Sequence, residues 1–243
     1  MNLQGRHILV TGAAKRVGRA IAESFLPYGV SLSLHYFRSE IAESELLPLA
    51  EKGGSRFFSV QADLCDVNSI RAAVQLAEAK FGPVDILVNS ASTFYPTPVL
   101  SVTEEQWDEL VDANVKGHFF FSQACAPQMS KRGGVILNIG DVNAERPVKN
   151  FTPYVVGKAG LLMLTKNLAK EWAPAIRVNA ISPGPVLIPE GYTPEKIERA
   201  AEKTLLKRWG TPEDIVQAVH FLIRNEYITG FNLRVDGGKS ILS

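Results

Sequence analysis

Short apolar runs rich in valine and isoleucine alternate along the chain with longer segments in which apolar residues recur at helical spacing. Such alternation is typical of βαβ units, in which helices connect parallel strands. We therefore expect an α/β fold whose parallel sheet is covered by helices. The predicted strands span residues 7–11, 30–36, 56–60, 84–89, 134–139, 177–181 and 232–235.

Several helix starts are marked by capping residues. Asp66 precedes one helical stripe, and Thr103 with Gln106 forms a capping-box pattern before another. Thr152–Pro153 and Thr211–Pro212 each place a hydroxyl before a proline, which predicts a capping threonine followed by proline at the first helical position.

Length and charge favour one globular domain over residues 1–243. The chain has 26 basic and 25 acidic side chains, a net charge of +1, and 46% of its residues are hydrophobic. This balance disfavours disorder and a basic nucleic-acid surface, so we expect no nucleic-acid partner. No apolar stretch predicts a membrane span, and the first sixteen residues do not resemble a secretory signal.

The cysteines favour a reducing compartment. Cys65 and Cys125 are far apart, with no CxxC pair or histidine cluster beside them. They predict neither a disulfide framework nor a metal site. We expect two reduced thiols in a cytoplasmic protein.

One segment is irregular and rich in proline. Residues 182–195 contain four prolines and follow a predicted strand. At the carboxyl edge of a parallel sheet such a loop is a candidate substrate lid, and a rigid surface loop is the alternative.

The first predicted strand runs into a glycine-containing turn and then a helix, the context of a dinucleotide-binding turn. Gly12 permits a tight turn, and Gly18 permits close packing of the helix on the sheet. Helix amides near Val17 can receive a pyrophosphate, and Arg16 stands where a middle glycine is usual. A purely structural turn is the alternative.

The second predicted strand ends without the acidic residue that an NAD site places there. His35 and Tyr36 are followed by Arg38 and Ser39, which can bind a 2′-phosphate through charge-assisted hydrogen bonds. The sequence therefore favours NADPH over NADH, although a solvated Arg38 is the alternative.

Further candidates follow the third and fourth strands. Asp63, with Leu64, is placed to accept a hydrogen bond from an adenine amino group or to cap a turn. Asn89 leads into Ser90 and Ala91 near the switch point of the sheet, where ligands collect.

Tyr154 and Lys158 are four residues apart in a predicted helix and so share one face. An ammonium beside a phenol lowers the pKa of the phenol and makes it a usable proton donor. Asn114 lies in helical register with Leu110 and Val111, and a buried amide there needs a partner, whether structural or functional.

Together these motifs resemble the short-chain dehydrogenase/reductase family over essentially the whole chain. The resemblance implies a single Rossmann-like domain with seven parallel strands, assembly into homotetramers and a tyrosine proton donor. It further implies that the lysine binds the nicotinamide ribose and that the asparagine supports a water relay. The motifs are the turn at Thr11, Asn89-Ser90-Ala91, Asn114, Tyr154 with Lys158, Pro183-Gly184 beside the cofactor, and the closing Val235-Asp236-Gly237-Gly238.

One departure from the family pattern concerns the reaction. Most members have a serine thirteen residues before the tyrosine, and this chain has Asp141. A carboxylate would repel a developing alkoxide, whereas it suits a substrate with N–H donors and a C=N bond.

Asp141, Arg16 and the segment from Ser92 to Pro98 together resemble the pteridine reductase branch of the family. That resemblance implies that Phe94 stacks a pterin on the nicotinamide, that Ser92 and Arg16 hold polar pterin edges, and that Asp141 and Tyr154 supply protons. Phe37 and Ser90 depart from the branch pattern. The alternatives are a carbonyl reductase, such as a 3-oxoacyl thioester reductase, and a non-catalytic NADPH-binding module.

Overall fold

Seven parallel strands form one sheet, as predicted, and their order is β3-β2-β1-β4-β5-β6-β7. A computed structural model describes residues 1–188 and 191–242. The register places Val10 opposite Leu34 and Val88, and Asn89 opposite Asn138. The strands are β1 (His7–Val10), β2 (Ser31–Tyr36), β3 (Arg56–Gln61), β4 (Ile86–Asn89), β5 (Gly134–Ile139), β6 (Ile176–Pro183) and β7 (Asn232–Val235).

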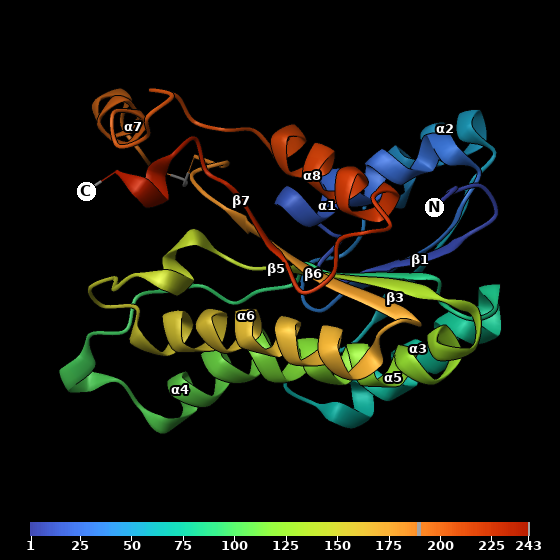
Figure 1. Ribbon diagram of the computed structural model, residues 1–243. Helices are drawn as coiled ribbons and strands as arrows, with labels where there is room; N and C mark the ends of the chain where they lie inside the picture. The colour runs from blue at the N-terminus through green and yellow to red at the C-terminus, as the bar shows by residue number, and fades with distance from the viewer. Residues whose placement is uncertain (189–190, 243) are drawn as a thin grey trace.

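Helices cover both faces of the sheet. α1, α2 and α8 lie on one face, and α3, α4, α5 and α6 lie on the other (Figure 1). Every crossover between neighbouring parallel strands carries a helix or a helical turn, as parallel pairing requires. The helices are α1 (Arg16–Phe25), α2 (Glu43–Gly53), α3 (Val67–Phe81), α4 (Glu104–Val111), α5 (Gly117–Arg132), α6 (Thr152–Trp172), α7 (Pro194–Ala201) and α8 (Pro212–Arg224).

Shorter helical turns complete the connections. α4 passes into α5 through a π-helical turn, η3 (Asp112–Lys116), so Asn114 lies in a widened turn rather than in a regular helical stripe. The remaining turns are η1 (Leu26–Tyr28), η2 (Val99–Ser101), η4 (Val142–Glu145) and η5 (Lys239–Ile241).

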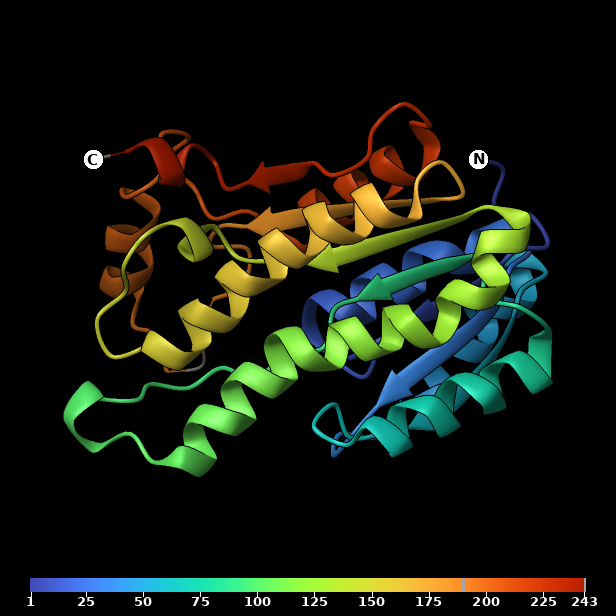
Figure 2. The same ribbon diagram turned by 60° about the horizontal axis from the view of Figure 1, so that its bottom comes forward.

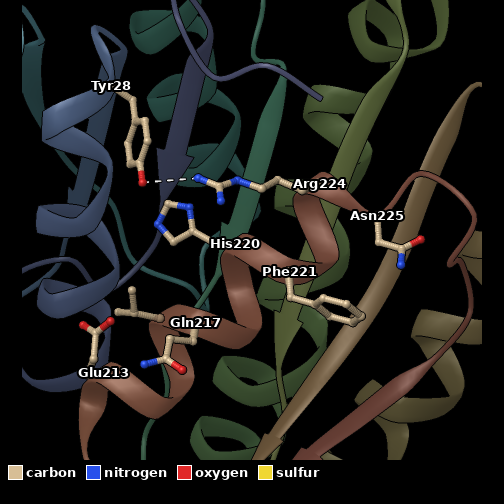
Figure 3. Close-up of a pocket in the computed structure, with 8 residues that line it drawn as sticks. Tyr28, Glu213, Gln217, His220, Phe221, Arg224 and Asn225 are labelled. Carbon is tan, nitrogen blue, oxygen red and sulfur yellow. Dashed lines mark hydrogen bonds between the residues drawn. The ribbon is translucent and has the colours of Figure 1, made fainter.

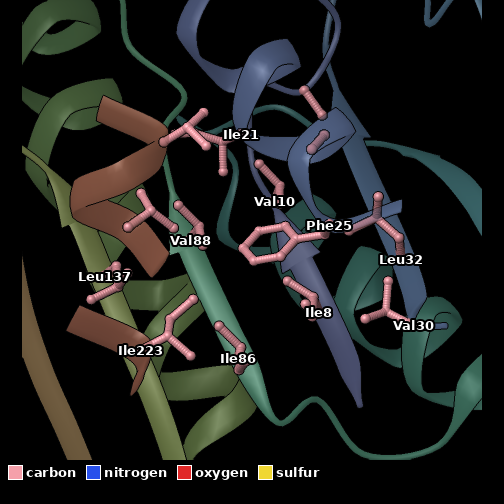
Figure 4. Packing of buried hydrophobic residues seen from close by; sticks show 14 of the residues in the cluster. Ile8, Val10, Ile21, Phe25, Val30, Leu32, Ile86, Val88, Leu137 and Ile223 are labelled. Carbon is pink, nitrogen blue, oxygen red and sulfur yellow. The ribbon is translucent and has the colours of Figure 1, made fainter. Parts of the chain in front are cut away.

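The two faces bury separate apolar cores. Figure 4 shows Phe25 of α1 among Ile8, Val10 and Val88 of the central strands. The other core packs the opposite face against α3, α5 and α6, with Phe121 fully buried. Side chains on both faces of β1 are buried, which explains the nearly continuous apolar run in its sequence.

Most predicted helix starts are confirmed. The Asp66 carboxylate accepts a hydrogen bond from the Asn68 amide, and Thr103 and Gln106 form a capping box. Thr211 occupies the N-cap of α8, and its amide donates to the Asp214 carboxylate. The prediction that Thr152 caps α6 is wrong.

Phe151 is the N-cap of α6, and Thr152 is already the first helical residue. A β-bridge pairs Phe151 with Thr97, and the Thr97 amide donates to the Asn150 carbonyl at 2.6 Å. These contacts fix the chain just before the helix, so the helix begins one residue earlier than the Thr-Pro pattern indicates.

The proline-rich segment is less irregular than its sequence suggests. Its first two residues belong to β6, and residues 194 and 195 begin α7. Pro189 and Glu190 lie outside the described residues. No helix in residues 1–188 or 191–242 combines the length and the apolar character that crossing a bilayer requires.

Candidate active site

The glycine turn between β1 and α1 is locked to the segment that follows β4. Gly12 has a φ of +68°, and a Cβ atom there would lie 2.7 Å from Ala91 Cα. A Cβ at Gly18 would collide with the Gly12 carbonyl. Thr11 Oγ1 accepts hydrogen bonds from the amides of Ser90 and Ala91 at 2.9 and 3.0 Å. The carboxyl edge of the sheet therefore carries a close-packed backbone turn that leads into the start of α1, and helix starts of this kind favour phosphate groups.

His35 supports the glycine turn through a hydrogen bond to Gly12. Its Nδ1 accepts from the Gly12 amide at 3.2 Å, and its Nε2 lies 3.1 Å from the Ala62 carbonyl. Burial lowers the pKa of His35 to about 4, so the ring is neutral and donates from Nε2. Both ring nitrogens are used inside the protein. His35 was predicted to bind the cofactor, and the structure places it as a positioning residue for Gly12.

Two exposed arginines border the turn. Arg16 begins α1 with a φ of +58°, and the Arg38 guanidinium lies 5.0 Å from the centroid of the Phe37 ring. In the described part of the chain, neither arginine forms an ion pair. Tyr36 and Ser39 are half-buried beside them. These positive charges are available to a phosphorylated ligand.

The residues after β3 form a local turn. The Asp63 carboxylate accepts from the Cys65 amide at 2.9 Å, and the Asp63 amide donates to Ser69 Oγ. Leu64 is buried against the position of Gly117. The turn alternative for Asp63 is confirmed, and its contact with adenine stays a prediction.

Asn89 belongs to a buried polar network below the site. Its Nδ2 donates to Asn138 Oδ1 at 2.9 Å and to Ser122 Oγ at 3.1 Å, and Asn138 Nδ2 donates to Thr165 Oγ1. The network joins β4 and β5 to α5 and α6. The Asn89 Oδ1 atom has no hydrogen-bond partner among the described residues, and contact of Asn89 with the cofactor stays a prediction.

Asn114 ties the loop after β4 to the helices. Its Oδ1 accepts from Ser92 Oγ at 2.6 Å, while its Nδ2 donates to the carbonyls of Thr93 and Leu110 at 2.8 and 2.9 Å. The amide is fully buried and its partners satisfy it. Asn114 thus holds the start of the segment that carries Phe94, and a part in a water relay stays a prediction.

Tyr154, Asp141 and Lys158 meet at the carboxyl ends of β4 and β5. Tyr154 Oη donates to Asp141 Oδ2 at 2.6 Å, and Asp141 Oδ1 accepts from the Asn143 amide at 2.7 Å. Lys158 Nζ donates to the Ile139 carbonyl at 2.8 Å. Tyr154 is 5% exposed and Lys158 is 2% exposed, so water is largely excluded from the group. The sequence-predicted catalytic residues are thus brought together.

The electrostatics of this group differ from the prediction. Burial and the adjacent Asp141 carboxylate raise the pKa of Tyr154 well above its usual range. The expectation that Lys158 lowers that pKa is therefore wrong for this structure: Lys158 Nζ lies 6.0 Å from the ring centroid, and Asp141 accepts directly from the hydroxyl. Burial also lowers the pKa of Lys158 to about 8.

An aromatic pair flanks the catalytic tyrosine. Phe94 stacks on Phe151 with centroids 4.7 Å apart and planes 10° from parallel, and it meets the Tyr154 ring edge-on at 4.8 Å. Phe94 is 61% exposed, which leaves apolar surface for a flat ligand. Sequence reasoning missed Phe151, because only the bridge to Thr97 brings that residue beside Phe94.

Pro183 and Gly184 close the site at the end of β6. The Gly184 amide donates to the Val235 carbonyl at 2.9 Å, and a Cβ at Gly184 would lie 2.6 Å from Asp236 Cα. The closing motif around Asp236 therefore packs directly against Pro183-Gly184.

A surface groove elsewhere does not contribute to this site. It lies along α8, where Arg224 donates to Tyr28 Oη at 3.2 Å and the His220 ring lies beside this hydrogen bond (Figure 3). α8 covers the face of the sheet opposite α6, which carries Tyr154 and Lys158 (Figure 1).

Comparison with known proteins places the chain among dehydrogenases and reductases. Residues 12–240 match the family profile adh_short_C2, described as enoyl-(acyl carrier protein) reductase. A 3-oxoacyl-[acyl-carrier-protein] reductase of Staphylococcus aureus is 34% identical over 237 residues, which cover 95% of this chain and 96% of that protein. Glucose 1-dehydrogenase 2 of Bacillus subtilis is 33% identical, with 99% and 96% covered.

Two solved structures are also similar to this chain in fold and in sequence. A blue fluorescent protein from a metagenomic library, in complex with NADPH, is 32% identical with a TM-score of 0.90 and covers 98% of this chain and 99% of that one. A variant of a Serratia marcescens short-chain dehydrogenase/reductase is 30% identical with a TM-score of 0.90, with 99% and 100% covered. The chain therefore belongs to the short-chain dehydrogenase/reductase family of oxidoreductases.

Proposed function

We propose that this oxidoreductase uses NADPH to reduce the C=N bond of a pterin-like substrate, a dihydropterin or a dihydrofolate-like compound, to the tetrahydro level. The observation that carries the proposal is the hydrogen bond from Tyr154 Oη to Asp141 Oδ2. A carboxyl group takes the place of the usual serine and is held against the tyrosine.

The residues around the glycine turn fit NADPH. Gly12 and Gly18 let neighbouring backbone segments approach more closely than a Cβ would allow, as a dinucleotide-binding turn requires, and Arg38 with Ser39 can bind a 2′-phosphate. The NADPH held by the related fluorescent protein supports this assignment. When bound, NADPH supplies a hydride to the substrate carbon. In this proposal Lys158 holds the nicotinamide ribose. Arg16 and Ser92 bind the polar edges of the pterin.

Reduction of a C=N bond also requires one proton at nitrogen, and Tyr154 can deliver it. Because its pKa is raised, Tyr154 Oη keeps its proton across the physiological pH range. The anionic nitrogen left by hydride addition is a strong base and can take a proton from such a weak acid.

The geometry of Asp141 favours a substrate that donates hydrogen bonds. Its Oδ1 is fixed by the Asn143 amide, so Oδ2 has a defined direction toward the tyrosine. An ionised carboxylate there would raise the energy of an alkoxide, whereas it would accept from ring N–H groups. The exposed face of Phe94 supports a flat heteroaromatic ring.

The second candidate is reduction of a carbonyl, such as that of a 3-oxoacyl thioester. The names of the relatives favour this candidate over pterin reduction, because they include 3-oxoacyl-[acyl-carrier-protein] reductases and a glucose dehydrogenase. Tyr154 and Lys158 would serve either reaction. A non-catalytic NADPH-binding module is disfavoured by the buried tyrosine, lysine and aspartate, which binding alone does not require.

Assembly as a cytoplasmic homotetramer remains part of the proposal. Exposed apolar side chains on α6, Val156 and Met163, support contact with another subunit. Light scattering coupled to gel filtration would measure the oligomeric state.

Absorbance of NADPH, followed with purified protein, tests the function. The substrates are 7,8-dihydrobiopterin, dihydromonapterin, dihydrofolate and a 3-oxoacyl thioester, with NADH as the cofactor control. Oxidation that depends on a pterin and prefers NADPH supports the proposal. Oxidation with the thioester alone would replace it by the second candidate.

A further inference from the structure

A group of basic side chains borders Asp141. Arg146 follows η4, and its Nε donates to Asn143 Oδ1 at 3.2 Å. A terminal nitrogen of the same guanidinium donates to the Lys239 carbonyl at 3.3 Å. Since the Asn143 amide binds Asp141, contacts run without a break from Asp141 to the C-terminal turn η5.

Lys203 lies in the segment after α7, and its charge acts on Lys239. The Leu206 amide donates to the Gly237 carbonyl at 3.1 Å, which fixes that segment against the end of β7. Figure 2 shows α7, the C-terminal turn and the loop after β5 gathered at one end of the molecule. We call Arg146, Lys203 and Lys239 the basic cluster.

The positive charges of the cluster act on one another. Burial lowers the pKa of the Lys239 ammonium, and the charges of Arg146 and Lys203 lower it further, while Asp141 and Asp236 act in the opposite direction. A half-buried ammonium among other cations is stabilised by a nearby anion.

The acidic groups nearby have other partners. Glu145 pairs with Arg234 at 2.5 Å. The Asp236 carboxylate accepts from the amides of Gly238 and Ser240. Within residues 1–188 and 191–242, no member of the basic cluster forms an ion pair.

We propose that the basic cluster binds an anionic group, a carboxylate or a phosphate, on a substituent of the substrate while the reacting bond lies at Tyr154 and Asp141. This inference rests on the proposed function for the identity of the reacting ring. It adds that substrates with an acidic side chain are preferred over neutral ones of the same ring type.

The position of the cluster assigns it to the substrate rather than to the cofactor. The predicted phosphate contacts of NADPH lie at the ends of β1 and β2, where Gly12 and Arg38 are found. Arg146 follows β5 and Lys239 follows β7, on the other side of the switch point in the sheet order. In the same sheet order β4, which leads to Phe94, lies between β1 and β5.

Matched pairs of substrates test the proposal with the intact enzyme. One pair is dihydrofolate, whose tail carries carboxylates, and 7,8-dihydrobiopterin, whose side chain is neutral. The other is acetoacetyl-CoA, which carries phosphates, and its neutral N-acetylcysteamine thioester. KM and kcat are measured for the wild type, for Arg146→Gln and Lys239→Gln, and for Lys207→Gln as the control. Lys207 is a nearby lysine that already pairs with Glu202.

We expect KM for the charged substrate to rise about tenfold in Arg146→Gln and Lys239→Gln, with the neutral partner unchanged. Lys207→Gln should change neither. Added salt should raise KM of the wild type for the charged substrate only, a test that needs no variant to fold.

The result that would overturn the proposal concerns the ratio of KM for the charged substrate to KM for its neutral partner. If this ratio changes neither in the variants nor with added salt, the cluster does not bind the substrate. Failure of the proposed function is distinguishable, because the wild type would then reduce only the thioesters. The same ratio, measured with the thioester pair, would still decide whether the cluster binds an anion.

Discussion

Tyr154 Oη donates a 2.6 Å hydrogen bond to Asp141 Oδ2, so the phenol proton is shared with a carboxyl group from a neighbouring element. Asp141 follows β5 and is the N-cap of η4, whereas Tyr154 lies in the first turn of α6. Together the two side chains hold the phenol proton. This pair distinguishes the chain from the family pattern, in which a serine stands in place of Asp141.

Tyr154→Phe removes the proton donor while it retains the packing of the ring. We expect kcat to fall by roughly 10²- to 10⁴-fold, because general acid catalysis contributes about that much. NADPH affinity, measured by fluorescence titration, should stay within about twofold, since Oη contacts Asp141 and not the glycine turn. Unchanged turnover with every reducible substrate would remove Tyr154 from the mechanism.

Lys158→Met should stabilise the protein near neutral pH while it lowers activity. The pKa of Lys158 falls from 10.5 to about 8 on folding, so burying its charge costs on the order of 3 kcal/mol. The variant also loses the hydrogen bond from Lys158 Nζ to the Ile139 carbonyl, which destabilises it by about 1 kcal/mol. The net gain in the free energy of unfolding is therefore roughly 2 kcal/mol.

The pH dependence identifies the cause of that gain. Between pH 8 and 10.5 the unfolded wild type binds more protons than the folded one, so its stability rises with pH in this window. The advantage of Lys158→Met should therefore be largest below pH 8 and vanish at about pH 9.5, and above pH 10.5 the lost hydrogen bond should leave the variant about 1 kcal/mol less stable. Urea unfolding across this range measures it, with Lys166→Met on the exposed side of α6 as the control. A pH-independent difference would contradict the assignment.

Arg38→Ala should reduce the preference for NADPH over NADH. Loss of a charge-assisted contact with the 2′-phosphate should raise KM for NADPH by about tenfold or more and leave KM for NADH nearly unchanged. Arg71→Ala is the matched control, because Arg71 is also exposed and lies over a phenylalanine ring, that of Phe120. Equal effects of both variants would show that Arg38 does not bind the phosphate.

Phe94→Ala should weaken substrate binding with little effect on stability, since the side chain is 61% exposed. If a pterin stacks on this ring, KM should rise by about three- to tenfold, and Phe94→Tyr should preserve binding. The melting temperature of both variants serves as the folding control. A KM insensitive to Phe94→Ala would place the substrate away from the aromatic pair.

Much of the fold follows from the chain pattern because parallel strands buried on both faces read as apolar runs. The predicted strands match the observed ones to within one or two residues, and β5 and β7 match completely. Thr152 shows the limit: the start of α6 depends on the bridge between Thr97 and Phe151, which lie far apart in sequence.

The site was predictable as a set of motifs but not as a network. Tyr154, Lys158 and Asp141 are identified by their spacing, yet the raised pKa of Tyr154 depends on burial and on one contact. The role of His35 below the glycine turn also depends on the position of a neighbouring strand.

The most direct test of the Asp141–Tyr154 pair is the ratio of kcat/KM for a dihydropterin to that for a 3-oxoacyl thioester, measured in the wild type and in Asp141→Ser. We expect the wild-type ratio to favour the dihydropterin, and the substitution to lower this ratio by at least about tenfold through loss of pterin turnover. A ratio that favours the thioester in the wild type and changes little in Asp141→Ser would contradict the proposed C=N chemistry.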